Sequence, residues 1–367
     1  MKKQVRECGS ASVRKCAGFN SRTDALTHSR TSVARYSLFP IPYSLLFALA
    51  GCDRQFSAVT PAGPQARRIS EMTWYLTITG SIVFVLVMGL LFYVLWRAHR
   101  RQDALGGEQV ERTMTHWVAG GVAATVVILL ATLVYNFYTG RALAQFAEPD
   151  ALTVRVTGHQ WWWEVQYQDP AYNRRVSTAN EIHIPVGRRV RLEVQSRDVI
   201  HSFWVPSLHG KLDLIPGYSG TTYLQADEPG VFMGRCAEYY GLQHARMDIR
   251  VIAESPQKFA AWYEGQLRAA AAPADSVQQK GQQVFLSKGC VMCHAVRGTP
   301  ANSRVGPDLT HLASRMTLAA GTLPNTRGHL AGWVMDPQRI KPGVRMPPNP
   351  LAADELQALL DYLQSLK

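Results

Sequence analysis

Two long stretches without a single charged residue limit what this chain can fold into. The first covers residues 74–96 and the second covers residues 117–138. At about 1.5 Å of rise per residue, a helix of either length spans a hydrocarbon layer of about 30 Å. Tryptophan and tyrosine lie near the ends of both stretches, as is typical of membrane–water interfaces. The sequence therefore predicts a hairpin of two transmembrane helices within residues 52–150.

The segment before the first span has the features of a lipoprotein-type signal peptide. Arg35 precedes a short apolar run that ends in Leu49-Ala50-Gly51-Cys52. A basic flank, a short apolar core and small residues before the cut are typical of a secretory signal, and the final cysteine resembles one that is acylated. Residues 1–51 are predicted to be an N-terminal extension and signal that is removed, with a plain signal peptide cut elsewhere as the alternative. The chain after Cys52 then starts outside the bacterial inner (cell) membrane, and two crossings return the remainder to the periplasmic or outer face.

The formal net charge of +12 does not indicate nucleic-acid binding. Residues 1–51 carry eight Lys or Arg and two acidic residues, which account for half of that charge. The remainder is spread along the chain, without a long basic run and without aromatic residues interleaved among basic ones. The composition therefore predicts a membrane partner but no nucleic acid.

From residue 151 the pattern changes to short strands. Residues 152–157, 181–184 and 190–194 alternate apolar and polar side chains, and glycine and proline separate them. Many short alternating strands predict an antiparallel β-sandwich over residues 151–264. Three consecutive tryptophans, Trp161–Trp163, cannot all face its core, because side chains alternate along a strand.

Residues 236–247 gather candidate metal ligands. They place a thiol, a carboxylate, an imidazole and a thioether at Cys236, Glu238, His244 and Met247. His201 adds a second imidazole upstream. Such a mixture of soft and borderline ligands suits copper better than calcium or magnesium.

This stretch resembles the copper loop of cytochrome c oxidase subunit II, whose pattern is Cys-x-Glu-x-Cys-x-x-x-His-x-x-Met with one more histidine upstream. The resemblance implies a cupredoxin-like sandwich with a CuA-type two-copper centre. It also implies a magnesium ion at Glu238, shared with the large subunit, and electron entry from a donor at the aromatic run. The matching positions are His201, Cys236, Glu238, His244 and Met247 for the metal, and Trp161, Trp162 and Trp163 for electron entry.

The chain departs from that pattern at one position, because Tyr240 stands where the second cysteine belongs. One thiolate cannot form the double sulfur bridge of a two-copper centre. Two imidazoles, one thiolate and one thioether remain, which is the ligand set of a mononuclear blue-copper site. Three explanations stay open: a degraded or lost site, a single copper, and a recent point change or sequence error at codon 240.

An alanine- and proline-rich stretch, residues 265–275, predicts a linker, and a second chemistry follows it. Cys290-Val291-Met292-Cys293-His294 is the attachment signal of one covalent c-type haem, with His294 as the proximal ligand. A redox Cys-x-x-Cys pair or half of a zinc site is the alternative. Met346 lies in a proline-rich loop that resists helix formation, and it is predicted to be the sixth ligand in preference to Met316 and Met335.

Residues 276–367 are predicted to form an all-α class I cytochrome c domain. Ser276 is the expected cap of a first helix over residues 277–288. A last helix carries apolar residues at i, i+3, i+4 and i+7, with two acidic residues in its first turn. Its apolar positions are Leu356, Leu359, Leu360 and Leu363.

Taken together, residues 52–367 resemble a bacterial oxidase subunit II with a fused cytochrome c. The resemblance implies a respiratory electron-entry subunit that accepts electrons from a soluble cytochrome c. It would pass them to subunit I, where oxygen is reduced, and it would also contact other oxidase subunits. The alternatives are a membrane-anchored electron-carrier or copper-handling lipoprotein outside an oxidase, and a subunit of a related nitric-oxide reductase. A quinol-oxidising subunit II would have no use for the haem signal.

Overall fold

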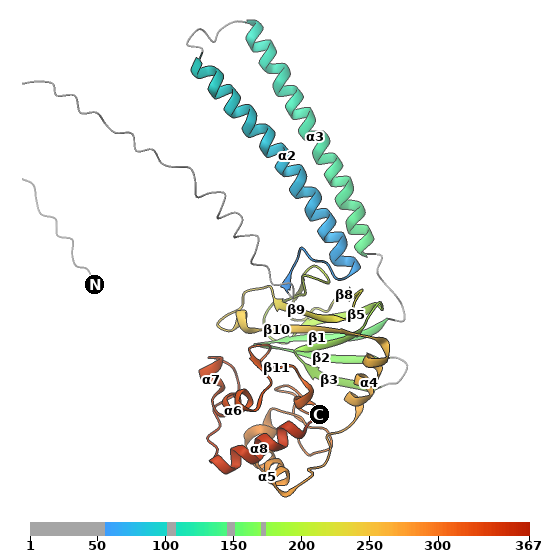
Figure 1. Cartoon of the computed structure of the whole chain (residues 1–367), viewed down its shortest axis with the longest axis vertical. Coiled ribbons are helices and arrows are strands. Elements are labelled where there is room, and N and C mark those ends of the chain that lie inside the picture. Colours follow the sequence, from blue (N-terminus) through green and yellow to red (C-terminus); the bar gives the residue numbers. More distant parts are fainter. Residues whose placement is uncertain (1–55, 101–107, 145–150, 170–173) are drawn as a thin grey trace, which may run out of the picture. The chain divides into compact units, whose positions relative to one another are not determined.

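The computed structural model describes residues 56–100, 108–144, 151–169 and 174–367 (Figure 1). The predicted signal segment and the lipidation of Cys52 lie outside these residues. The described part contains two long helices, a β-domain and a helical C-terminal domain, which is the predicted fold class.

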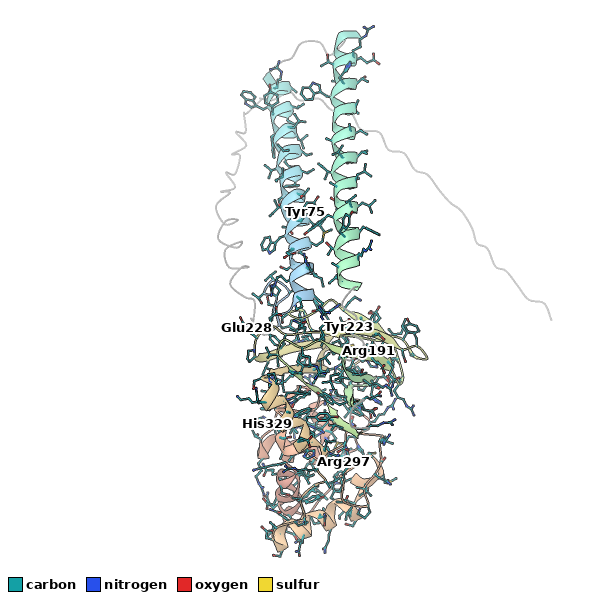
Figure 2. All side chains as sticks on the ribbon, turned by 90° about the vertical axis from the view of Figure 1, so that its right-hand side faces the viewer. Tyr75, Arg191, Tyr223, Glu228, Arg297 and His329 are labelled. Atoms are coloured by element: carbon teal, nitrogen blue, oxygen red, sulfur yellow. The ribbon has the colours of Figure 1, made fainter. Side chains whose placement is uncertain are left out.

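The two long helices form a hairpin. They are α2 (Pro64–Arg100) and α3 (Glu108–Ala144), and each continues beyond the uncharged stretch that it contains. The Tyr75 hydroxyl lies 3.2 Å from the Thr132 hydroxyl, and its ring meets Tyr135 edge-on at 5.0 Å. Figure 2 shows Tyr75 on the side of α2 that faces α3. Most of the other apolar side chains of both helices are exposed, as expected of helices surrounded by lipid.

The β-domain is a sandwich of two five-stranded sheets. The first sheet has the order β3-β2-β1-β5-β8 and the second has the order β4-β10-β9-β6-β7. The strands of the first are β1 (Leu152–His159), β2 (Trp162–Asp169), β3 (Arg174–Ala179), β5 (Val190–Ser196) and β8 (Gly220–Leu224). Those of the second are β4 (Glu181–Pro185), β6 (His201–Trp204), β7 (Leu212–Leu214), β9 (Gly230–Cys236) and β10 (Asp248–Glu254).

Both sheets are mixed, so the prediction of a purely antiparallel sandwich is wrong. Strand β1 pairs with β5 in parallel, and β4 pairs with β10 in parallel. Alternation along a strand reports which side chains are buried, and it looks the same whether the neighbouring strand runs parallel or antiparallel. The direction of pairing therefore could not be inferred from the short strands alone.

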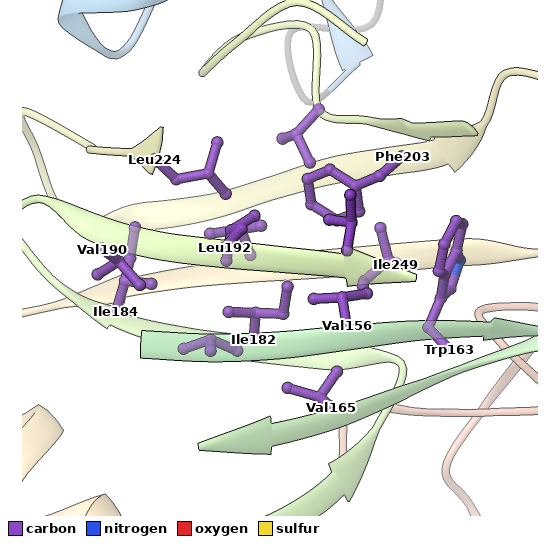
Figure 3. Close-up of a cluster of buried hydrophobic side chains, with 14 of the residues drawn as sticks. Val156, Trp163, Val165, Ile182, Ile184, Val190, Leu192, Phe203, Leu224 and Ile249 are labelled. Carbon is purple, nitrogen blue, oxygen red and sulfur yellow. The ribbon is translucent and has the colours of Figure 1, made fainter. Parts of the chain in front are cut away.

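The inward side chains of the two sheets form the core of the β-domain. Figure 3 shows Val156, Leu192 and Ile249 in this core, with Trp163 at one end of the cluster. Trp163 is fully buried, whereas Trp161 and Trp162 are only partly buried. The three tryptophans therefore divide between the core and the surface of the domain, as the alternation along a strand requires.

The C-terminal domain is built from four helices and short turns. The helices are α5 (Ser276–Ser287), α6 (Arg327–Met335), α7 (Pro337–Ile340) and α8 (Ala353–Ser365). Strands β11 (Thr317–Leu318) and β12 (Leu323–Pro324) pair as a two-stranded ribbon. The predicted cap at Ser276 is wrong by one residue. Asp275 is the cap, because its carboxylate accepts a 2.8 Å hydrogen bond from the Gln278 amide. The predicted last helix is confirmed as α8, and Leu359, Leu360 and Leu363 are buried.

The first part of the segment between the two domains is held in place by hydrogen bonds. Helix α4 (Pro256–Leu267) runs into the predicted linker. Beyond it, the Ala270 amide donates to the Arg297 carbonyl at 3.0 Å, and the Arg297 guanidinium donates to the carbonyls of Gln266 and Leu267. Arg297, labelled in Figure 2, therefore ties the end of α4 to the C-terminal domain.

Candidate functional site

The Cys-x-x-Cys-His stretch directly follows α5. One turn of 3-10 helix, Gly289–Met292, contains the first three residues of this stretch, and the amides of Cys293 and His294 both donate to the Cys290 carbonyl. Cys290 and Cys293 are free thiols. This tight turn brings the two sulfurs and the imidazole to one wall of the C-terminal domain.

His294 is oriented by a backbone carbonyl. Its Nδ1 lies 2.8 Å from the Pro307 carbonyl oxygen, which makes Nδ1 the donor and leaves Nε2 free to ligate a metal. Burial lowers the pKa of His294 and so favours the neutral form that ligation needs. Gly306 is required here, because a Cβ at this position would lie 2.8 Å from Cε1 of His294.

A cavity of about 390 Å³ opens beside these residues. Met346 lines it, whereas Met316 and Met335 do not. Most of the remaining wall is apolar, and it includes Phe285, Leu309, Leu330, Val334, Leu359 and Leu363. Two thiols and an imidazole with a free Nε2 beside an apolar cavity, with a thioether also in its wall, fit a covalently attached haem.

The β-domain completes the wall of this cavity. His159, Gln160, Trp161 and Trp162 line it together with the residues of the C-terminal domain. His159 stacks on Trp162 at 4.4 Å, and its Nε2 lies 3.3 Å from a carboxylate oxygen of Glu164. The turn between β1 and β2 and the first residue of β2 therefore present two indole rings to the proposed haem cavity.

Trp163 faces the opposite way, towards the candidate copper ligands. Its indole N–H donates to the Met247 carbonyl at 3.3 Å, and its ring lies 5.9 Å from that of His201. Adjacent residues of a single tripeptide thus touch the proposed haem cavity on one side and the copper-type loop on the other.

Both candidate histidine ligands have a free ring nitrogen. His201 is fully buried, and its Nε2 lies 2.8 Å from the Asp198 carboxylate, so that Nδ1 has no partner. The Nδ1 of His244 is also buried without a partner. Unpaired buried polar atoms are costly, and a bound metal ion is one of the few things that satisfies them.

Cys236 provides the thiol of the pocket and is 6% exposed. Its sulfur accepts from the Ser202 amide at 3.3 Å and lies 3.6 Å from the Glu238 carbonyl oxygen. Burial alone would raise the pKa of Cys236, but the neighbouring His201 imidazole and the hydrogen bond from the Ser202 amide outweigh it and lower the pKa. A thiol with a lowered pKa is more readily available as the thiolate that binds metal.

Tyr240 fills the centre of this pocket. Its hydroxyl donates to the Met247 sulfur at 2.5 Å, and the Cys236 sulfur is also close enough to raise the pKa of Tyr240. Its ring meets those of His201 at 4.4 Å and His244 at 5.4 Å, both close to edge-on. Within the part of the chain that the structure describes, no three His, Cys, Asp or Glu side chains are grouped closely enough to hold a metal ion. The two-copper centre of the family therefore does not fit these residues.

Two polar residues at the site could not be predicted from the sequence. Asp198 orients His201 through the hydrogen bond to its Nε2. In the sequence, Asp198 is marked only by its position three residues before His201. Lys341 lies in the wall of the haem cavity and is 1% exposed. A lysine between an isoleucine and a proline carries no pattern that distinguishes it from a solvated side chain.

The chain resembles two protein families along its length. Residues 169–254 match the periplasmic domain of cytochrome c oxidase subunit II, and residues 278–367 match cytochrome c. Cytochrome c oxidase subunit 2 of Alkalihalophilus pseudofirmus is 35% identical over 339 residues, which cover 89% of this chain and 96% of that protein. The same subunit of Bacillus subtilis is 29% identical and covers 87% of this chain and 94% of its own length. Among solved structures, the periplasmic domain of subunit II of cytochrome oxidase (CoxB) of Bradyrhizobium japonicum aligns with a TM-score of 0.31 and 32% identity, over 32% of this chain and 95% of that domain.

Proposed function

Because this chain belongs to the cytochrome c oxidase subunit II family and ends in a cytochrome c domain, we propose that it carries single electrons from a soluble cytochrome c to the large subunit of its oxidase. It is a subunit of a haem–copper oxidase complex, and oxygen reduction belongs to the partner. This membership favours the oxidase over a free electron-carrier or copper-handling lipoprotein. Its β-domain matches the periplasmic domain of subunit II, and two helices are long and apolar enough to cross a membrane. Both observations support an inner-membrane location with both globular domains on the outer face.

One observation carries the proposal: a single cavity is lined both by the Cys-x-x-Cys-His stretch and by the tryptophans of the β-domain. Cys290 and Cys293 would hold a haem by thioether bonds, with His294 and Met346 as axial ligands. Haem c supplies an iron that takes up and releases one electron. The Pro307 carbonyl fixes the imidazole tautomer, and the apolar wall keeps water from the iron ligands.

The electron is proposed to leave the C-terminal domain through the indole rings of Trp161 and Trp162. The family resemblance had assigned this run to the entry of electrons from an external donor. Here the chain's own cytochrome domain lies against it. An external cytochrome c therefore has to meet the C-terminal domain first, and the exposed side chains of Met292 and Val305 at the cavity mark the accessible edge.

We infer that the pocket at Cys236 takes one copper ion once the Tyr240 ring leaves its centre, because His201, His244 and Cys236 have to draw closer together than they stand here before they can share a metal. Its donors would be the free Nδ1 atoms of His201 and His244 together with the sulfurs of Cys236 and Met247. Two copper ions are disfavoured, because Tyr240 supplies no second bridging thiolate and its ring occupies the centre of the pocket. The partly buried Glu238 is the proposed contribution to a magnesium site shared with the large subunit.

The copper content of the purified oxidase tests this pocket. One copper is taken to belong to subunit I and is subtracted from the total. The ratio of the remaining copper to haem c should be about one, and Tyr240→Cys should raise it to about two. A ratio of two in the wild-type protein, after the same subtraction, would contradict the inference and would point to an error at codon 240. A ratio of zero would show that the tyrosine closes the site.

Electron delivery is tested by following the haem of this chain in the intact oxidase. Reduced cytochrome c is added without oxygen, and the c-type absorption band should appear. Admission of oxygen should then reoxidise the haem within the time of one turnover. Trp161→Leu should slow reoxidation, whereas Trp262→Leu should not, because Trp262 stacks on His183 and does not line the cavity. A haem that stays reduced while oxygen is consumed would be a dead end and would refute the proposal.

A further inference from the structure

Lys341 is buried at the boundary between the two domains. Its Nζ lies 2.9 Å from the Trp161 carbonyl, 2.5 Å from the Arg246 carbonyl and 3.1 Å from the Ala319 carbonyl. The three N–H groups of an ammonium match these three acceptors. Trp161 and Arg246 belong to the β-domain and Ala319 to the C-terminal domain, so one side chain joins three separate segments.

The burial of this ammonium is costly without its carbonyl partners. No carboxylate within the described residues lies within 4.0 Å of Nζ. Burial lowers the pKa of Lys341 to about 7, the charge of Asp248 opposes this shift and that of Arg246 adds to it. Two of the three acceptors exist for Lys341 only while the domains are in contact. In the docked state the three carbonyls replace the water that the ammonium loses, and a side chain without donors would take this partner away from the Trp161 and Arg246 carbonyls.

Lys341 lies within a continuous strip of contacts between the domains. The strip joins residues 319–320 and 340–343 to residues 242–248, and a Cβ at Gly343 would lie 3.5 Å from the Trp161 ring. The other polar contacts of the strip are Gln243 Nε2 to the Pro342 carbonyl at 2.7 Å, the Arg246 guanidinium to the Ile340 carbonyl, and the Asp248 amide to the Ala320 carbonyl at 3.0 Å.

The strip is coupled directly to the loop of the proposed axial methionine. The Gln338 side chain accepts from the Gly343 amide at 2.9 Å and donates to the Met346 carbonyl at 2.8 Å. The segment that Lys341 fixes therefore continues into the backbone that presents Met346. Any movement of the strip would displace the methionine loop and the Trp161 wall relative to each other.

We propose that Lys341 is an interdomain positioning residue, which keeps the cytochrome domain docked on Trp161 so that electrons leave the haem within a fixed pair of domains. The direction of electron flow in this inference rests on the proposed function. The docking itself does not, so the two can be tested separately.

Hydrogen exchange of the purified full chain tests the docking. In Lys341→Met, which keeps an unbranched apolar stem, the amides of residues 242–248 and 340–343 should exchange about tenfold faster or more, a change that corresponds to roughly 1.4 kcal/mol. Lys280→Met is the control, since Lys280 is a surface residue of the same domain that pairs with Asp354 at 2.7 Å. Gln243→Leu removes a neutral bond of the same strip from the β-domain side and should give a smaller rise. This second variant keeps the test decisive if Lys341→Met misfolds. Unchanged exchange in both strip variants would overturn the proposal.

Reoxidation kinetics in the intact oxidase test the consequence for electron transfer. Lys341→Met should slow the reoxidation of the haem about tenfold and make it depend on solvent viscosity, because the domains would have to meet before each transfer. Its c-type absorption band should stay as in the wild type, which excludes loss of the haem, and its midpoint potential is measured so that the two rates are compared at known driving force, since Lys341 lines the cavity. Equal, viscosity-independent rates in both proteins would refute the positioning role. A wild-type haem that oxygen does not reoxidise would instead refute the proposed function, and the exchange result would still stand.

Discussion

The crossing of α5 and α8 depends on the absence of a side chain at Gly281. A Cβ there would lie 2.0 Å from the Ala358 carbonyl oxygen and 2.7 Å from Cβ of Tyr362. Ordinary contacts of a Cβ begin near 3.4 Å, so Gly281→Ala has to separate the two helices by roughly 1.4 Å. Backbone atoms form the obstacle, and rotation of a side chain cannot relieve it.

The expected cost follows from two opposing contributions. Overpacking of this kind costs about 1–3 kcal/mol, and the separated helices also lose packing between the rings of Phe285 and Tyr362. Alanine in a helix interior regains up to about 1 kcal/mol relative to glycine. The net loss should therefore be about 2 kcal/mol. For a domain of this size that lowers the unfolding temperature by roughly 10 °C.

Thermal unfolding of the C-terminal domain within the full chain, followed by circular dichroism in the haem bands, measures this change. Gly332→Ala is the matched control, because Gly332 lies in α6 of the same domain and a Cβ there would meet Ile340 at an ordinary 3.7 Å. The control should unfold at the same temperature as the wild type or slightly higher. If Gly281→Ala were as stable as Gly332→Ala, the close crossing of the helices would be refuted.

Two further substitutions test the sites. Met346→Leu should remove the proposed thioether ligand and lower the midpoint potential of the haem in a redox titration, whereas Met316→Leu should leave it unchanged, since Met316 is 46% exposed and lies outside the cavity. Burial raises the pKa of Asp198, but hydrogen bonds from His201 and from the Gln160 and Val199 amides outweigh it and hold the pKa at about 2. Because this pKa is depressed on folding, wild type should exceed Asp198→Asn in stability by about 1 kcal/mol above pH ~4, and the difference should vanish as the pH falls through about 2. Unfolding temperatures of both proteins at pH 6 and pH 2 check this, and a difference that persists at pH 2 would contradict it.

Features that depend on neighbours in the sequence were the ones that could be predicted. The uncharged stretches, the alternation along β1 and β5, and the apolar stripe of α8 each follow from a few adjacent residues. The candidate site was also largely contained in two short motifs. The cap of α5 was the local exception, because Asp275 and Ser276 are both good caps and only the observed bond of Asp275 distinguishes them.

Features that depend on distant partners could not be predicted. The parallel pairing of β1 with β5 joins residues nearly forty positions apart, and nothing in either strand specifies its direction. The contacts of Lys341 with Trp161 and Arg246 join residues more than ninety positions apart. The division of the tryptophan run was foreseen from alternation, but the identity of the surface that covers Trp161 and Trp162 was not.

The same tryptophan run explains why the change at Tyr240 need not cut the chain off from its oxidase. Trp161 and Trp162 line the proposed haem cavity, and Trp163, the next residue, contacts the Met247 backbone and lies beside His201. On the proposed electron path, an electron that enters this tripeptide has therefore already reached the copper-type pocket, with or without copper in it. The loss of one thiolate alters the next acceptor and leaves the approach to it intact. Copper content and haem reoxidation consequently have to be measured on the same preparation, because neither alone separates an altered relay from a broken one.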